Sequence, residues 1–492
     1  MRCHHFAKQL PALGILGVIG LGLAGCASPP SSTDAQWRLS QDRLQAEQSS
    51  PPVEGTLTLA AAIDRALRLN LAQKARQVEA ALASGQVDLA ELEMLPTLTT
   101  RTSGSDRRND RVTRSVDLAT GLPAPGRFIS QDREHVVQEL SLSWNLIDFG
   151  LGYLNTRQAQ ARLAMTEQRN RKAAHQLAQD VRVAYWRAAS AQMLLPKIER
   201  AIAQAERALS DSQLLAQSRL RNPQDVLRYQ KQLLENLRLL EALASDFEQA
   251  QVDLAHLIQH PLGSALTLVL PERSRVDQAL LDAPIGELER EAIAQHPDLR
   301  EQLAASDMAE IEAHKVWARL FPNVRLSVGD FRDSDRFQVN PRWQESSWQI
   351  SWNLVHLFTL QTQERFAKAG IAAADQRRIA TQMAVIAQVH VARVMLLASQ
   401  RQLERAESIW QTDQRLADIA RLRENAGSLS ALERVSSDVA AILSEARRYQ
   451  SLAQHQAAMG KLVFSLGRDT QPELALAPRA TLIAHQHPSA GQ

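Results

Sequence analysis

The stretch Glu139-Leu140-Ser141-Leu142-Ser143-Trp144-Asn145-Leu146 alternates strictly between polar and apolar side chains, and Ser347-Trp348-Gln349-Ile350-Ser351-Trp352-Asn353-Leu354 repeats the pattern. A period of two is typical of a β-strand, because successive side chains of a strand point to opposite faces of the sheet. Each stretch therefore predicts a strand with one apolar face, formed by Leu140, Leu142, Trp144 and Leu146 in the first and by Trp348, Ile350, Trp352 and Leu354 in the second.

The repeated strand belongs to a longer internal duplication. Ala66-Leu67-Arg68-Leu69-Asn70 and the later Leu95-Pro96-Thr97-Leu98 recur as Ala292-Ile293-Ala294-Gln295-His296 and Phe321-Pro322-Asn323-Val324. The offset of 226 residues between these copies falls to 208 at the repeated Trp, so 18 residues were gained or lost between them. An insertion tolerated at one place indicates an exposed loop, which we place at 103–133.

Each copy changes its periodicity in the order helix, strand, strand, helix. Residues 56–94 and 283–320 have helical spacing and end at a proline, which cannot continue a helix. Long helical stretches follow at 152–258 and 360–466, interrupted only near 221–223 and 425–428. Pro196 is predicted to kink or locally break the first of them. Heptad spacing predicts coiled-coil packing at Leu233, Leu237, Leu240, Ala244, Phe247, Gln251 and Leu254, and at Val435, Val439, Ile442, Ala446, Tyr449 and Ala453.

The amino-terminal residues predict export and lipid attachment. A short basic head and the apolar run 10–23 precede Leu23-Ala24-Gly25-Cys26. The run is too short for a membrane-crossing helix and is typical of a cleaved leader. The four residues resemble the lipobox of bacterial lipoproteins, and Ala27 implies, by that resemblance, forwarding to the outer membrane. Cys26 is then the lipidated first residue, and an ordinary signal peptide with a chance cysteine is the alternative.

Composition excludes several classes of function. Cys3 and Cys26 are the two cysteines, so the mature chain has no internal disulfide and no thiolate metal site. The 56 basic and 54 acidic residues are interleaved, whereas nucleic-acid binding needs a concentrated positive face. We find no phosphate-binding glycine loop and no catalytic Ser motif, and we predict no enzyme activity, cofactor or metal. His256 and His260 stand four apart on a predicted helix, but without a third ligand we interpret them as surface or packing residues.

The apolar strand faces have two possible partners. In a soluble sheet they would meet a core, and in an outer-membrane barrel they would meet lipid, with the polar faces lining a wet lumen. Segments 128–153 and 317–358 hold 12 of the 22 aromatic residues, which suits the interfacial girdles of a barrel, although aromatics also favour strands in general. Four strands cannot close a barrel, since about eight is the smallest number. A barrel therefore requires several chains.

Four features occur together in this chain: the duplicated helix-proline-strand junctions, His296-Pro297-Asp298-Leu299, the strand end 143–150 and the helix end Leu462 to Gly467. In these features the chain resembles TolC-like outer-membrane efflux factors. The resemblance covers about residues 56–468. It implies a mainly α fold with a membrane β-barrel portion, namely a homotrimer whose 12-stranded barrel continues into an α-helical periplasmic tunnel. It also implies a periplasmic adaptor and an inner-membrane pump as partners, in efflux or type I secretion. The Trp/Phe-Asp-Pro-Leu signature of many lipid-anchored relatives is absent, and Gln36-Trp37-Arg38-Leu39 stands in that region.

The helical interruptions are expected to form the periplasmic tips. In relatives, a small-residue turn at the tip meets the adaptor, and acidic residues just beyond it help to keep the entrance closed. Gly427-Ser428-Leu429-Ser430 matches that turn and Glu433 the acidic position, while Arg221-Asn222-Pro223 and Asp225 stand there in the first copy. Alternatively, each acid is a solvated residue stabilised by the helix dipole.

These features divide the chain into a signal peptide, an acylated linker, a first repeat, an inter-repeat linker, a second repeat and a polar tail, at 1–25, 26–55, 56–262, 263–282, 283–468 and 469–492. The predicted function is passive exit across the outer membrane. A lipid-anchored periplasmic coiled-coil adaptor or scaffold is the alternative, although an adaptor has one helical hairpin rather than two complete copies.

Overall fold

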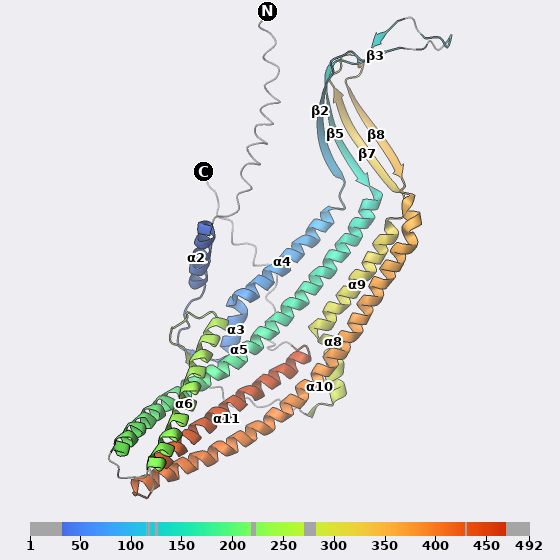
Figure 1. Ribbon diagram of the computed structural model, residues 1–492. Helices are drawn as coiled ribbons and strands as arrows, with labels where there is room; N and C mark the ends of the chain where they lie inside the picture. Colours follow the sequence, from blue (N-terminus) through green and yellow to red (C-terminus); the bar gives the residue numbers. More distant parts are fainter. Residues whose placement is uncertain are drawn as a thin grey trace, which may run out of the picture.

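The computed structural model describes residues 32–114, 116, 119–123, 126–217, 223–269, 282–428 and 431–468. The chain forms an elongated body of long helices that carries a β-sheet at one end (Figure 1). It is mainly α, with strands in both copies, as the periodicity predicts.

The helices follow the predicted order in both copies. The first copy contains α3 (Leu59–Leu69), α4 (Leu71–Leu92), α5 (Leu146–Gln217) and α6 (Pro223–Leu257), and the second contains α8 (Ile285–Gln295), α9 (Pro297–Ala318), α10 (Val355–Asn425) and α11 (Ala431–Ser465). In the linker before the first copy lies a further helix, α2 (Ser32–Gln48). The longest helix, α5, has 72 residues and spans about 100 Å at 1.5 Å per residue.

Both short helical stretches are split in two, which the periodicity did not predict. Asn70 ends α3, and its side chain accepts a hydrogen bond from the backbone N–H of Gln73 at the start of α4. In the second copy His296 has the same role, with its Nδ1 accepting from the backbone N–H of Asp298. These two residues are equivalent in the duplication, so the bend is part of the repeated unit.

The strands form one antiparallel sheet in the order β2-β5-β7-β8. Their bounds are Thr97–Asp106, Glu134–Asn145, Asn323–Asp333 and Arg342–Ser351. A small hairpin, β3 (Val112–Thr113) with β4 (Phe128–Ile129), extends the connection between β2 and β5. The two copies thus contribute one strand pair each, joined where β5 meets β7. The predicted loop at 103–133 is shorter than expected, because β2 continues to Asp106 and the hairpin orders part of the remainder.

The core lies mainly among the helices, in three apolar clusters. One packs α3 on α5 and α6, another packs α8 and α9 on α10 and α11, and the third joins α5, α6 and α11 through the predicted heptad positions. Leu233, Leu240 and Leu254 of the seam are fully buried. Gln251, the polar member of the seam, is exposed, and Ala250 is buried beside it.

A two-stranded parallel sheet, which was not predicted, ties the inter-repeat linker to the start of the first copy. Its strands are β1 (Thr56–Leu57) and β6 (Thr267–Leu268). The side-chain amide of Gln192 on α5 donates to the Leu268 carbonyl and accepts from its N–H. The Tyr185 hydroxyl lies 2.8 Å from the Leu57 carbonyl, and its burial raises the pKa of Tyr185 to about 12.

Of the two outcomes predicted at Pro196, a kink or a local break, the break is wrong, because α5 runs through this residue without interruption. Proline removes one backbone hydrogen bond and crowds the preceding turn. The neighbouring Leu194 and Ile198 are fully buried in the cluster shared with α6 and α11. This packing holds both sides of the proline in one helix.

Candidate functional site

The apolar face of the sheet is exposed along its length. Leu142 lies between Leu98 and Val328 on the neighbouring strands, and the three side chains are exposed by 45%, 67% and 58%. The next row contains Trp144, Leu326 and Trp348, also exposed, with Ile350 beyond them and Leu140 on the opposite side of the Leu142 row. Nothing in the described chain covers this face. Trp352 follows the end of β8, where its Nε1 donates to the Leu320 carbonyl at 2.9 Å.

The opposite face is mostly polar and contains hydroxyl pairs between strands. The hydroxyls of Thr99 and Ser141 are 3.0 Å apart, and those of Ser327 and Ser347 are 2.7 Å apart. Aromatic residues are not confined to the apolar face, because Phe331 and Trp343 stack at 5.3 Å on the polar face. The sheet therefore separates an apolar side from a side that suits water.

Both edges of the sheet are open in the described chain. The edge strands β2 and β8 each pair with one neighbour only. Unpaired backbone groups at an edge are costly in a lipid environment, which has no water to bind them. The sheet is therefore incomplete as a membrane structure without further strands.

The opposite end of the molecule contains the tip between α10 and α11, and Gly427 shapes its turn. Gly427 has φ +70°, a conformation that favours glycine. The N–H of Ser428 donates to the Arg423 carbonyl at 2.9 Å, and that of Gly427 donates to the Glu424 carbonyl at 2.8 Å. This pair of bonds is the Schellman arrangement that ends helices, and it explains the small residue at this place.

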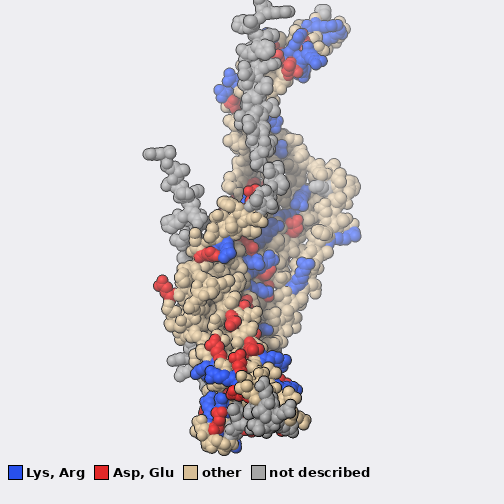
Figure 2. All heavy atoms as spheres, turned by 60° about the vertical axis from the view of Figure 1, so that its left-hand side comes forward, with Lys and Arg blue, Asp and Glu red and all other residues tan. Residues whose placement is uncertain are grey.

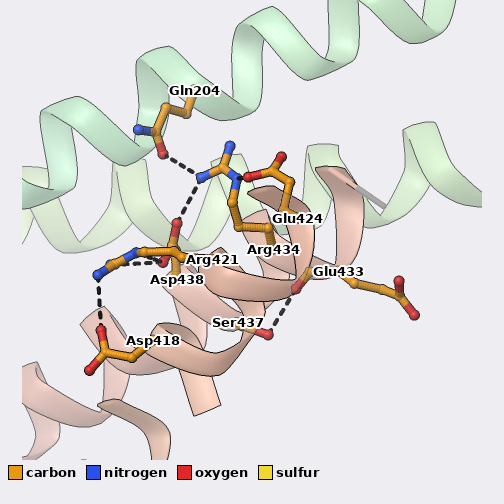
Figure 3. Close-up of polar contacts among 8 residues, drawn as sticks. All are labelled: Gln204, Asp418, Arg421, Glu424, Glu433, Arg434, Ser437 and Asp438. Carbon is orange, nitrogen blue, oxygen red and sulfur yellow. Dashed lines mark hydrogen bonds and ion pairs between the residues drawn. The ribbon is translucent and has the colours of Figure 1, made fainter. Parts of the chain in front are cut away.

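A network of charged side chains lies just above this turn (Figure 3). Arg421 on α10 contacts Asp438 on α11 at 2.9 Å, and Arg434 contacts the other oxygen of Asp438 at 2.9 Å. Arg434 also forms an ion pair with Glu424 at 2.6 Å and donates to Gln204 on α5 at 3.3 Å. The network therefore connects three helices. Asp438 is buried, and its charge is compensated by the two guanidinium groups.

Further ion pairs connect α11 to α5 and to α10. Lys197 on α5 contacts both oxygens of the buried Glu445, at 2.7 and 2.8 Å. On the other side, Arg448 forms an ion pair with Glu407 and lies 4.4 Å from the centre of the Trp410 ring. A movement of α11 away from α5 would break the contact of Lys197 with Glu445 and that of Arg434 with Gln204. The sequence analysis did not find these residues, because only Arg434 and Asp438 have the i,i+4 spacing of a helical ion pair and the other partners lie far apart along the chain.

The acids predicted at the tips lie outside this network. Asp225 is exposed in the first turn of α6, and Glu433 lies in the first turn of α11 with its side chain directed away from the network in Figure 3. The backbone carbonyl of Glu433 accepts from Ser437 at 2.8 Å. The structure thus places both acids at helix starts but does not bring them together. Cys26, Arg221, Leu429 and Ser430 lie outside the described residues.

The histidines predicted to be packing or surface residues have those positions. His256 is exposed, and His260 is buried with its Nδ1 accepting from the Val53 N–H at 3.3 Å. Burial lowers the pKa of His260. Within the described ranges, no group of three or more His, Cys, Asp or Glu side chains is arranged to hold a metal ion.

One helical segment of the described chain is long and apolar enough, by length and composition, to cross a membrane. It is Phe358–Asn425 of α10, and 22% of its most apolar window is buried. Large apolar side chains exposed along this helix include Met383, Val391, Val394 and Leu416. Composition alone does not distinguish a membrane span from a helix face that packs on another protein surface.

Comparison with known proteins agrees with this geometry. The family model described as outer membrane efflux protein matches residues 288–468. Protein CyaE of Bordetella pertussis is 28% identical over 283 residues, which are 55% of this chain and 59% of the relative. The chain thus matches about six-tenths of the length of this curated relative.

Solved structures match most of the chain. The outer-membrane channel OprN has a TM-score of 0.65 at 19% identity, covering 86% of this chain and 95% of OprN. The open state of the Neisseria gonorrhoeae MtrE outer membrane channel has a TM-score of 0.64 at 18% identity, covering 84% of this chain and 90% of MtrE. The fold is that of TolC-like outer-membrane channels. The outer membrane efflux protein model matches most of the second copy of this chain, and this match together with the fold agrees with the resemblance found in the sequence.

Proposed function

We propose that this protein is the outer-membrane exit duct of an efflux or type I secretion system. The observation that carries the proposal is the four-stranded sheet with one exposed apolar face, one polar face and two open edges. Lipid covers the apolar face, and the polar face lines a water-filled passage. The helical body extends the passage into the periplasm, where an adaptor and an inner-membrane pump supply the substrate and the energy.

The assembly is a homotrimer in this proposal. Edge strand β8 of one subunit pairs with β2 of the next, so three sheets of four strands close one barrel of 12 strands. The exposed apolar side chains of α10 then pack on a neighbouring subunit, as do Val78, Leu82 and Leu89, which are exposed on α4. Packing between subunits explains an apolar helix face far from the sheet.

Planar-bilayer recording with the purified chain tests the channel. We expect stable pores and a trimer that dissociates on heating in detergent. A monomer that is released from membranes by mild salt and forms no pores would contradict the channel and favour the adaptor or scaffold. The channel structures reported above do not favour that alternative.

The charged network at the tip is proposed to hold the periplasmic entrance closed. Arg434→Met removes the contacts with Asp438, Glu424 and Gln204 together, so we expect a severalfold higher closed-state conductance. Arg423→Met is the matched control, because Arg423 is an exposed arginine near the same turn. Equal conductance of the two variants would contradict the role of the network.

The acids of the tips form a separate test. If Asp225 and Glu433 help to keep a narrow ring of carboxylates closed, the double variant Asp225→Ala with Glu433→Ala should raise the single-channel conductance. An unchanged closed-state conductance would leave the two acids as solvated residues at helix starts.

We also propose that Cys26 is acylated and anchors the chain to the membrane. Incorporation of labelled palmitate into the protein tests this anchor, and we expect the Cys26→Ser variant to lose the label.

A further inference from the structure

The two strand pairs differ most in the connection at their outer end. The β7–β8 connection is short, from Asp333 to Arg342, whereas the β2–β5 connection is longer and carries the β3–β4 hairpin. We call residues 107–133 the arginine hairpin. Its described residues, 107–114, 116, 119–123 and 126–133, lie beyond the last paired residues of the β2–β5 ladder, at the end farthest from the helices (Figure 1).

The arginine hairpin is basic in a chain that is nearly neutral. It contains six arginines and three aspartates, with neither lysine nor glutamate. Figure 2 shows Lys and Arg side chains gathered at this end of the molecule, whereas charges of both signs are mixed on the lower helical body. The excess charge is therefore local rather than a property of the whole surface.

At the base of the hairpin the charges are compensated. Arg133 donates to both oxygens of Asp110, at 2.6 and 2.9 Å, and this contact lowers the pKa of Asp110. Arg336 of the short connection forms an ion pair with Asp132 at 2.6 Å. Two of the three aspartates are thus already paired with arginines, one within the hairpin and one in the short β7–β8 connection.

Four other arginines have no such partner. Arg107, Arg108, Arg114 and Arg127 are exposed, and none of them forms an ion pair within the described part of the chain. Large apolar side chains accompany them, with Leu122 exposed by 66% and Phe128 by 49%. Val112 and Ile129, which pair across the hairpin, are also exposed. Exposed guanidinium and apolar groups together suit the boundary between lipid headgroups and acyl chains.

We propose that the arginine hairpin binds the phosphate groups of phosphorylated lipid A in the outer leaflet of the membrane around the channel. A guanidinium group offers parallel N–H donors that match two phosphate oxygens, and it keeps its charge at every relevant pH. The apolar residues of the hairpin contact the lipid beside these phosphates. An acidic protein would match the charge but would leave the exposed apolar side chains unexplained. The inference rests on the proposed outer-membrane location.

Native mass spectrometry of the full-length protein in detergent tests this binding. The probes are bisphosphorylated lipid A, enzymatically dephosphorylated lipid A and inorganic phosphate. The unmodified protein should bind the phosphorylated lipid about tenfold more tightly than the dephosphorylated one, and this preference should weaken at high salt. The quadruple variant Arg107→Gln, Arg108→Gln, Arg114→Gln, Arg127→Gln should lose the preference.

The matched control replaces four exposed arginines of the long helices, Arg207, Arg228, Arg401 and Arg405, by glutamine. It removes the same charge and should keep the preference. Equal binding of the two lipids by the unmodified protein, or an equal loss in both variants, overturns the inference. Displacement of the lipid by inorganic phosphate at the same concentration also overturns it, because the hairpin would then recognise phosphate without lipid.

Conductance separates this inference from the proposed function. In phosphatidylcholine bilayers, which contain no lipid A, the quadruple variant should form the same pores as the unmodified protein. Absence of pores from the unmodified protein would contradict the channel itself. Normal pores without any lipid preference would contradict only the role of the arginine hairpin.

Discussion

The sheet and the long helices place their apolar side chains in opposite ways. In the helices, Leu233, Leu240 and Leu254 are fully buried against other helices of the same chain. In the sheet, Leu142 and Trp348 have the same apolar character but remain exposed. The helical body therefore carries its own core, whereas nothing in the described part of the chain covers the apolar face of the sheet. In the proposed channel, lipid covers this face and strands of neighbouring subunits pair with its edges.

The largest effect is expected in the helical core. Leu240→Ala removes a fully buried side chain and should lower the free energy of unfolding by about 2–5 kcal/mol. Leu239→Ala, at a neighbouring exposed position, should cost less than about 0.5 kcal/mol. Denaturant unfolding of both variants, followed by circular dichroism, checks the difference. Similar losses would show that the described core is not what stabilises the helices.

A charge on the exposed face of the sheet comes next. Leu142→Arg places a guanidinium where lipid is expected and should cost about 2–4 kcal/mol per chain. Ser141→Arg places the same group on the polar face and should be tolerated. The yield of heat-modifiable trimer in outer-membrane fractions measures the effect. A sheet that tolerates both changes equally does not face lipid on the Leu142 side.

The smallest effect concerns a histidine buried in the helical body. His296 is fully buried, its Nε2 has no hydrogen-bond partner in the described chain, and its ring lies 5.8 Å from that of Phe464. Burial lowers the pKa of His296, and the nearby Lys172, His175 and Arg171 act in the same direction, against Asp298. The folded chain therefore resists protonation at this residue.

A lowered pKa in the folded state predicts the direction of the pH effect. At a pH above about 6.5, the pKa of a histidine in the unfolded chain, His296 is neutral in both states and does not lower the free energy of unfolding. As the pH falls below that value, the unfolded chain binds the proton first, so stability decreases. His296→Asn keeps an acceptor for the Asp298 N–H but does not titrate. Its melting temperature should fall less between pH 7.5 and 5.5, and an unchanged slope would exclude His296 as a source.

Periodicity and duplication predicted the main elements, because these signals are local or repeat within the chain. Strict alternation gave the faces of β5 and β8, and heptad spacing gave residues of the coiled-coil core such as Leu240 and Val439. The glycine turn at Gly427 also followed from residue type, since its positive φ favours glycine. The split at Asn70 and His296 was missed, because a capping side chain carries no periodic signal.

The sequence by itself determined where the four strands of the main sheet and the long helices lie and that four strands cannot close a barrel, because these follow from spacing and count. The tertiary structure alone decided that Arg434 joins α5, α10 and α11, that β6 pairs with β1, and that Pro196 stays within a helix. These features depend on residues brought together from distant parts of the chain. The interactions between these distant residues outweigh the local conformational preferences on which an interpretation of the sequence rests.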